Sequence, residues 1–421
     1  MVSKGEDMRM IARICMSLYV FISVGVVYAE DRSSPLPQYD LSQLLSIALE
    51  HHPALALSEA NVGVSEGRLR GTKEYTNPEL SVSAGPGRVT TGPSNRGIEE
   101  SIRVLQPVEW MPKRSARIRA AQEAVQGSAA QHQDLLRRVT ATVSEAYYSL
   151  LGAQREFGLA TQTASTVQRV AETARKRVEA GEAPKFERIR AEVELQRATK
   201  EVERARSGVA MRRAGLDAEV GGALGKQFEV IGEFPEGKTI WDLSEVMKAA
   251  DHHPSLRARE REEAERQELL RVARTSRVPD VAVFGTFERE IDRESYRAGL
   301  SIPLPIWSQR QGAIAEATAG ARRANAQLHQ TKVELRKDVI HAFEQYRIAK
   351  AHLELFRKGL LRQAEEAAEI ARKSYRFGEI SLLELLEAQR VALQVTREYY
   401  QAQVDLALAL TTLERLTGGL P

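Results

Sequence analysis

The spacing of apolar residues along most of the chain is typical of long helices. Between residues 112 and 180 they recur every three or four positions, and no internal proline interrupts the run. This spacing predicts a helix of about 65 residues, roughly 100 Å long at the usual rise per residue. Gly181 and Pro184 then break the pattern, and a second helical run follows. We therefore predict an antiparallel helical hairpin over about 112–219.

A second pattern, with a period of two, precedes this hairpin over about residues 78–107. A stretch rich in Gly, Pro and Ser divides it into two strands, and the alternation returns at about 279–305. Strands of about ten residues with one apolar face are what a membrane β-barrel requires. The residues that we expect to face lipid are Ile102, Val104, Leu300 and Ile302.

The two halves of the chain resemble each other, which indicates an internal duplication with a period of about 200 residues. Three pairs of segments keep the same order in both halves: D-L-S…H-H-P at Asp40–Pro53 and Asp242–Pro254, VSEAYYSLLGA from Val143 and VIHAFEQYRIA from Val339, and ARKRVEAGE from Ala174 and ARKSYRFGE from Ala371. We predict two structural repeats, 30–222 and 242–421, joined by a connector over 223–241.

The second repeat contains the matching hairpin over about 309–417, and its first helix is predicted to run unbroken over 309–377. Each repeat thus combines a helix, two strands and a long hairpin, which defines a mainly α fold with a small β-barrel portion. Four strands cannot close a membrane barrel, because the smallest have about eight. An open strand edge in lipid would leave backbone groups unpaired. The strands therefore require several chains, and three chains would supply twelve.

The N-terminal residues 1–29 have the pattern of a secretory signal peptide, with a basic start, an apolar run and small residues before Glu30. Cys15, the only cysteine, lies in that run without a small-residue lipidation motif, so we expect neither disulfides nor a lipid anchor. No later apolar run is long enough for a transmembrane helix. The formal net charge of +3 gives no indication of nucleic-acid binding.

Several motifs resemble those of the TolC-like outer-membrane efflux proteins: YRFGEISLLELLEAQR from Tyr375, its weaker counterpart RVEAGEAPKFERIRAEVE in the first half, Asn77-Pro78, and the I-P-L-P of Ile302–Pro305. With the duplicated plan, the resemblance covers essentially the whole mature chain. It implies a trimer in which a 12-stranded outer-membrane β-barrel continues as an α-helical barrel through the periplasm. The implied function is that of a passive exit duct of a tripartite efflux pump. The mature length resembles that of the heavy-metal, cobalt–zinc–cadmium type branch.

The resemblance also implies partners and sites. The hairpin turns would meet a periplasmic adaptor protein, which links the duct to an inner-membrane pump of the resistance-nodulation-division type. The residues at the two turns are Gly181, Glu182, Gly378 and Glu379. Glu384 and Glu387 match acidic positions that ring the closed periplasmic aperture in the family, which implies a gate. The alternative is that both are ordinary exposed helix acids, with Glu387 paired to Arg390.

Catalytic and metal-binding signals are weak. The chain has no G-x-S-x-G, no H-E-x-x-H and no phosphate-binding glycine loop, so we predict neither an enzyme nor a cofactor. The pairs His51-His52 and His252-His253 each precede a proline, where the family has a turn between helices. No cysteine or second histidine cluster lies nearby, so we predict no metal site.

Three other functions stay open on the sequence. The chain could be the outer-membrane component of a type I protein secretion system, which would use the same architecture. A periplasmic adaptor is disfavoured because two unequal hairpins dominate the chain, whereas an adaptor would carry one hairpin among strands. A purely structural coiled coil is disfavoured by the four alternating strands.

Overall fold

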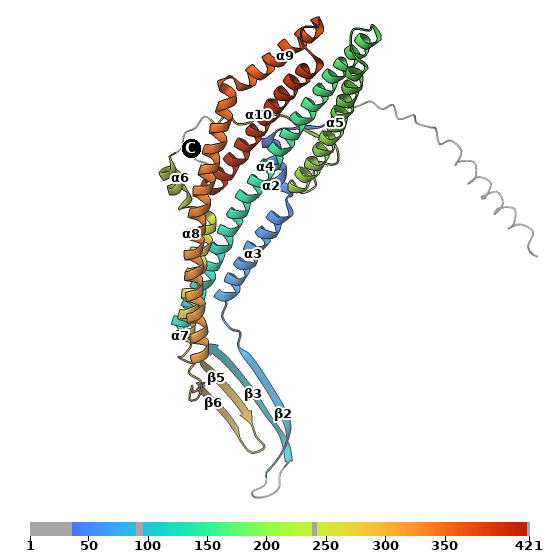
Figure 1. Cartoon of the computed structure of the whole chain (residues 1–421). Coiled ribbons are helices and arrows are strands. Elements are labelled where there is room, and N and C mark those ends of the chain that lie inside the picture. Colours follow the sequence, from blue (N-terminus) through green and yellow to red (C-terminus); the bar gives the residue numbers. More distant parts are fainter. Residues whose placement is uncertain (1–35, 90–95, 238–241, 419–421) are drawn as a thin grey trace, which may run out of the picture. The chain divides into compact units, whose positions relative to one another are not determined.

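The structure, a computed structural model, describes residues 36–89, 96–237 and 242–418 (Figure 1). The predicted signal peptide, residues 1–29, lies outside the described residues. The chain divides into two compact units, Met1–Pro37 and Gln38–Pro421, and every helix and strand named below belongs to the second. This unit is mainly helical, as the apolar spacing predicts.

One succession of elements occurs twice: two helices, two strands and a long helical hairpin. The first half contains β1 (Gln38–Tyr39), α2 (Leu41–His51), α3 (Pro53–Lys73), β2 (Glu79–Arg88), β3 (Arg96–Val108), α4 (Met111–Glu179) and α5 (Lys185–Glu219). The second contains β4 (Glu229–Val230), α6 (Leu243–Ala250), α7 (Pro254–Thr275), β5 (Val281–Arg289), β6 (Glu294–Ser301), α8 (Gln311–Leu355), the π-helical turn η1 (Phe356–Leu360), α9 (Leu361–Phe377) and α10 (Leu382–Thr417). The short β1 and β4 pair in parallel and tie the start of the described chain to the connector.

The first arm of the second hairpin differs from the sequence prediction. An unbroken helix over 309–377 is wrong, because α8 ends at Leu355 and a π-helical turn follows. Within that turn Gly359 leaves helical geometry, with φ 122° and ψ −4°. α4, the matching helix of the first half, is continuous over 69 residues. Apolar residues keep their three-and-four spacing on either side of the turn, so the spacing alone does not reveal the interruption.

The paired histidines begin helices. His52 and His253 are the N-caps of α3 and α7, and proline is the first residue of each helix. The Nδ1 atom of each ring accepts a backbone N–H bond of 3.2 Å from the residue two positions ahead. This geometry favours the turn between helices over a metal ligand. In the described part of the chain, no group of three or more His, Cys, Asp or Glu side chains is placed to hold a metal ion.

Buried apolar side chains hold the two arms of each hairpin together at the end where the short helices pack. Val143 of α4 and Leu216 of α5 are fully buried in one cluster, and Val339 of α8 and Leu406 of α10 are fully buried in another. Burying a side chain of this size stabilises the fold by about 1.5–3 kcal/mol. These clusters therefore fix the base of each hairpin.

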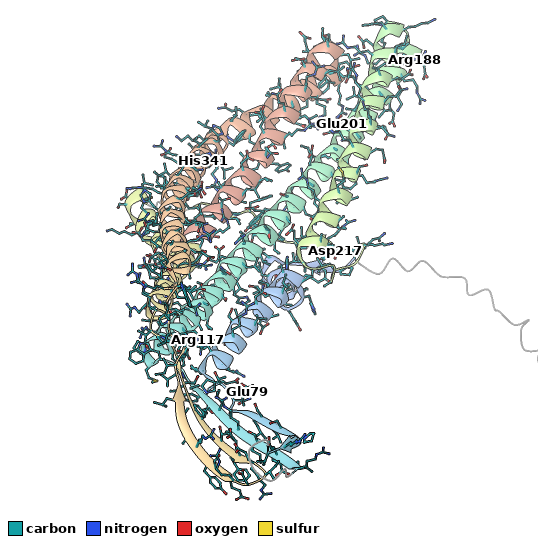
Figure 2. All side chains as sticks on the ribbon, turned by 90° about the horizontal axis from the view of Figure 1, so that it is seen from below. Glu79, Arg117, Arg188, Glu201, Asp217 and His341 are labelled. Carbon is teal, nitrogen blue, oxygen red and sulfur yellow. The ribbon has the colours of Figure 1, made fainter. Side chains whose placement is uncertain are left out.

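The strands lie at one end of the long helices, and the turns of both hairpins lie at the other (Figure 1). Figure 2 labels Glu79, at the start of β2 beside the helices, and Arg188, near the start of α5 at the end of the helices away from the sheet. α4 packs against α5, α7 and α10, so the two hairpins lie side by side. The fold thus separates a small sheet from two helical tips.

Candidate functional site

The four longer strands form one antiparallel sheet, in the order β2-β3-β5-β6, with an apolar face. One row on that face contains Val82, Ile102, Phe287 and Tyr296. Val104 and Leu300 lie on the same face, in two rows next to each other. Val104 has 47% of its surface exposed and Leu300 has 65%. Ile302 follows the end of β6 at Ser301, so its position on this face stays a prediction.

The opposite face of the sheet is polar and charged. One row on it contains Ser81, Arg103, Thr286 and Arg297. Arg297 Nη1 lies 2.9 Å from Glu288 Oε2, and the Arg103 guanidinium lies 4.6 Å from the ring centre of Phe284. A sheet with one apolar and one charged face is suited to separate lipid from water.

An ion triad interrupts the apolar face near the loop between β5 and β6. Arg289 lies 2.9 Å from a carboxylate oxygen of Glu294 and 3.6 Å from one of Glu100. Sequence reasoning missed this triad, because it depends on the register between β3 and β5. The alternation around Glu100 gives its face but not its partner across the strands.

The two hairpin turns share one backbone structure. Gly181 and Gly378 both have φ 78°, a left-handed conformation that only glycine adopts without strain. Glu182 and Glu379 each donate their backbone N–H to the carbonyl five residues earlier, at 2.8 and 3.0 Å. These bonds belong to a Schellman motif, which satisfies the last carbonyl groups of a helix. A Cβ on either glycine would meet no atom within 4 Å, so the preference for glycine comes from the backbone conformation alone.

Glu384 caps the helix that carries it. Its Oε2 accepts the backbone N–H of Ser381 at 2.8 Å and the Ser381 hydroxyl at 3.0 Å. These hydrogen bonds to Ser381 lower the pKa of Glu384. Glu387 Oε2 lies 3.1 Å from Arg390 Nη1, which is the pairing expected of an ordinary helix acid. In a single chain each carboxylate thus has a local partner, and a gate formed by both stays a prediction.

The residue of the first repeat that matches Glu384 is Glu187, and it makes a different contact. The Tyr375 hydroxyl donates to Glu187 Oε2 at 3.4 Å, and the Arg177 guanidinium lies 5.1 Å from the Tyr375 ring centre. Tyr375 is only 2% exposed. Burial, and then the Glu187 carboxylate, raise the pKa of the Tyr375 hydroxyl. The two hairpin tips therefore touch through a buried tyrosine, a contact that sequence reasoning missed.

No helix in the described part of the chain combines the length and the apolar character that a membrane span requires. Residues 44–222 and 246–419 match the model of the family described as outer membrane efflux protein, and the chain belongs to that family. It is an outer-membrane efflux channel that extends into the periplasm. Members of this family are channel proteins rather than enzymes.

Individual proteins of similar sequence or structure support the assignment to this family. The cobalt-zinc-cadmium resistance protein CzcC of Cupriavidus metallidurans is 27% identical over 398 residues, which cover 94% of this chain and 93% of that protein. Among solved structures, the outer-membrane channel OprN matches with a TM-score of 0.77 at 19% identity, over 90% of each chain. VceC of Vibrio cholerae matches with a TM-score of 0.74 at 16% identity, over 90% of this chain and 96% of that one. The resemblance to TolC-like channels is thereby confirmed.

Proposed function

We propose that three copies of the chain form the passive exit duct of a tripartite efflux pump, with a 12-stranded barrel in outer-membrane lipid. The observation that carries this proposal is the four-stranded sheet with one apolar face and two edge strands, β2 and β6. In lipid, each unpaired backbone group on such an edge costs several kcal/mol. Pairing β6 of one copy with β2 of the next leaves no open edge, and three copies complete the barrel.

The helices beside the two edge strands support the same closure. α3 leads into β2, and α8 follows β6. One face of α8 carries exposed apolar side chains at intervals of seven or eight residues: Val333, Ile340, Ile348 and Leu355. α3 carries exposed Leu57 and Val64, one such interval apart. Apolar stripes of this kind are buried in assemblies, so we propose that they form the helical part of the contact between copies.

We propose divalent metal cations as the cargo. The support is the relative named for cobalt, zinc and cadmium resistance, which aligns over nearly the full length of both chains. A pump of the resistance-nodulation-division type in the inner membrane would deliver the ions through a periplasmic adaptor. The adaptor would dock on the two hairpin turns, which contain Gly181, Glu182, Gly378 and Glu379. These turns lie at the end of the helices away from the sheet (Figure 1), and both glutamates are exposed.

We also propose the gate at the periplasmic mouth. Three copies of Glu384 and Glu387 would face one narrow aperture, and repulsion between like charges would favour protonation and the binding of multivalent cations. The hydrogen bonds from Ser381 act in the opposite direction on Glu384. The gate therefore depends on crowding in the trimer rather than on the environment within one chain.

Fractionation and mass measurement test the proposal. The protein should fractionate with the outer membrane and have the mass of three mature chains in detergent, whereas a monodisperse monomer that inserts into bilayers would contradict the trimer. Cells that lack the chain should lose tolerance to cobalt, zinc and cadmium but not to organic drugs. Unchanged metal tolerance in such cells would contradict the cargo.

A further inference from the structure

The hairpin formed by β2 and β3 brings two arginines directly opposite each other. Arg88 ends β2, Arg96 begins β3, and the two residues are partners in the last row of the pairing. Both are exposed. Like charges directly opposite each other in a sheet are destabilising. A pair of this kind therefore gains stability when an anion lies between the two side chains.

The chain supplies no acidic partner for this pair. In the described part of the chain, no ion pair joins Arg88 or Arg96 to a carboxylate. Residues 89–95, which connect the two strands, contain neither Asp nor Glu. The nearest acids along β3 are placed elsewhere, because Glu99 belongs to the opposite, polar face and Glu100 belongs to the ion triad. The tip of this hairpin thus has two positive charges and no local counter-charge.

The other hairpin of the sheet, formed by β5 and β6, has a different arrangement of charges. Near its tip, Arg289 lies 2.9 Å from a carboxylate oxygen of Glu294, and Arg293 lies 3.0 Å from one of Glu290. Both arginines therefore have a carboxylate partner within their own hairpin. The unbalanced pair on β2 and β3 is thus a feature of the first repeat and not of every strand tip in this chain.

The arginine pair lies on the apolar face of the sheet, just beyond its apolar part. Arg96 has the same parity along β3 as Ile98 and Val108, which are both exposed. Trp110 follows Val108, and aromatic residues mark the borders of the apolar band of a membrane barrel. From Val108 to Ile98 the strand rises about 26 Å, at about 3.4 Å per residue and a tilt of about 40°. The band is about 25 Å tall, so Arg96 and its partner Arg88 lie at the level of the lipid headgroups.

We propose that Arg88 and Arg96 bind a phosphate group of a lipid in the outer leaflet of the outer membrane. The helices extend into the periplasm, so the end of the sheet away from them meets the outer leaflet (Figure 1). Lipids of that leaflet carry phosphate groups on their sugar headgroups, and a guanidinium group binds phosphate through two parallel hydrogen bonds. One phosphate between the two side chains replaces their repulsion with attraction. This inference rests on the proposed function, because it requires an assembled barrel in that membrane.

Lipid binding by the full-length trimer tests the site. A titration with bisphosphorylated lipid A in maltoside detergent, followed by native mass spectrometry, gives the affinity of the trimer for this lipid. Because a hydrogen bond to a charged group is worth about a tenfold change in affinity or more, Arg96→Gln should weaken binding at least about tenfold. Lipid A without its phosphate groups should bind weakly to the wild type and to the variant alike. Equal affinity of the two proteins for bisphosphorylated lipid A overturns the proposal.

The matched control is Arg293→Gln, which removes one exposed arginine from the other strand tip, where Glu290 pairs with it. It should leave the affinity for lipid A unchanged, and an equal loss in this variant overturns the proposal, because net charge alone would then explain the binding. Inorganic phosphate at millimolar concentration should not displace the lipid from the wild type. Displacement would identify a site for soluble phosphate and overturn the lipid as its ligand.

Thermal stability separates a lipid ligand from a contact with the neighbouring copy. In maltoside detergent, which has no phosphate, trimers of Arg88→Gln/Arg96→Gln should be at least as stable as the wild type, because the variant lacks the repulsion between the two arginines. A less stable or unassembled variant would show that an acid of the neighbouring copy holds the arginines, which overturns the proposal. Failure of the proposed function is distinguishable, because the wild-type protein itself would then be monomeric or absent from the outer membrane.

Discussion

Lysine at position 102 would place a charge in the middle of the apolar face of the sheet. Ile102 is the central residue of β3, which spans Arg96–Val108, and it pairs with Val82 and Phe287. This row is the first beyond the ion triad of Glu100, Arg289 and Glu294 on the same face, so in a bilayer it lies inside the apolar band. A lysine that faces lipid costs about 2–4 kcal/mol of folding free energy at the midplane and about 0–1 kcal/mol near the border, so we expect a cost of about 2 kcal/mol at position 102.

Ser101 is the matched control, because it is adjacent to Ile102 and lies on the polar face beside Glu288. Folding into lipid vesicles at increasing urea concentration, followed by the fraction of folded trimer, measures the free energy lost in each variant. The loss should be large for Ile102→Lys and negligible for Ser101→Lys. Equal losses in the two variants would refute the assignment of the two faces.

Three further predictions concern the tips and the base of the helices. Gly378→Val should reduce the metal tolerance of cells while trimers persist, because a β-branched residue is strained at φ 78°. Gly378→Asn should retain most of the tolerance. Equal tolerance in the two variants at matched expression would contradict this prediction. Glu384→Gln/Glu387→Gln should weaken block by multivalent cations from the periplasmic side of planar bilayers, and unchanged block would show that both are surface acids. Burial lowers the pKa of His253 below its ordinary value of about 6.5, so the unfolded chain binds the proton more readily and stability should decrease as the pH falls from about 7 to about 5. Thermal unfolding should show that decrease in the wild type but less of it in His253→Asn, and an equal decrease in both would exclude His253 as its source.

Features that depend on local backbone chemistry could be predicted from the sequence. Gly181 and Gly378 follow long helical runs, and a left-handed residue after a helix is most often glycine, so the structure has both turns where the pattern indicates them. The alternation around Ile102 likewise predicts that it shares a face with Val104, because side chains of a strand point to opposite sides in turn. Both inferences depend only on residues that are close in the sequence.

Features that depend on register or on contacts between repeats could not be predicted in this way. The contact of Tyr375 with Glu187 joins residues of different hairpins, and nothing in the spacing of either hairpin indicates the height at which they meet. The ion pair of Arg289 with Glu100 needs the register of β3 against β5. The break at Gly359 escapes the apolar pattern for a different reason, since apolar residues keep their three-and-four spacing on both sides of it.

Duplication supplies two similar hairpins, and residues at matching positions of the two repeats make different contacts. Glu384 caps its own helix through Ser381, whereas the matching Glu187 accepts the hydroxyl of Tyr375 from the other hairpin. The second hairpin therefore carries both the interrupted helix and the side chain that holds it against the first. A hydrogen bond to a charged group contributes about 1.5–3 kcal/mol, and coupling between binding sites is typically about 1–3 kcal/mol. A partner that docks on the tips would therefore need a coupling of this full size to offset the contact of Tyr375 with Glu187.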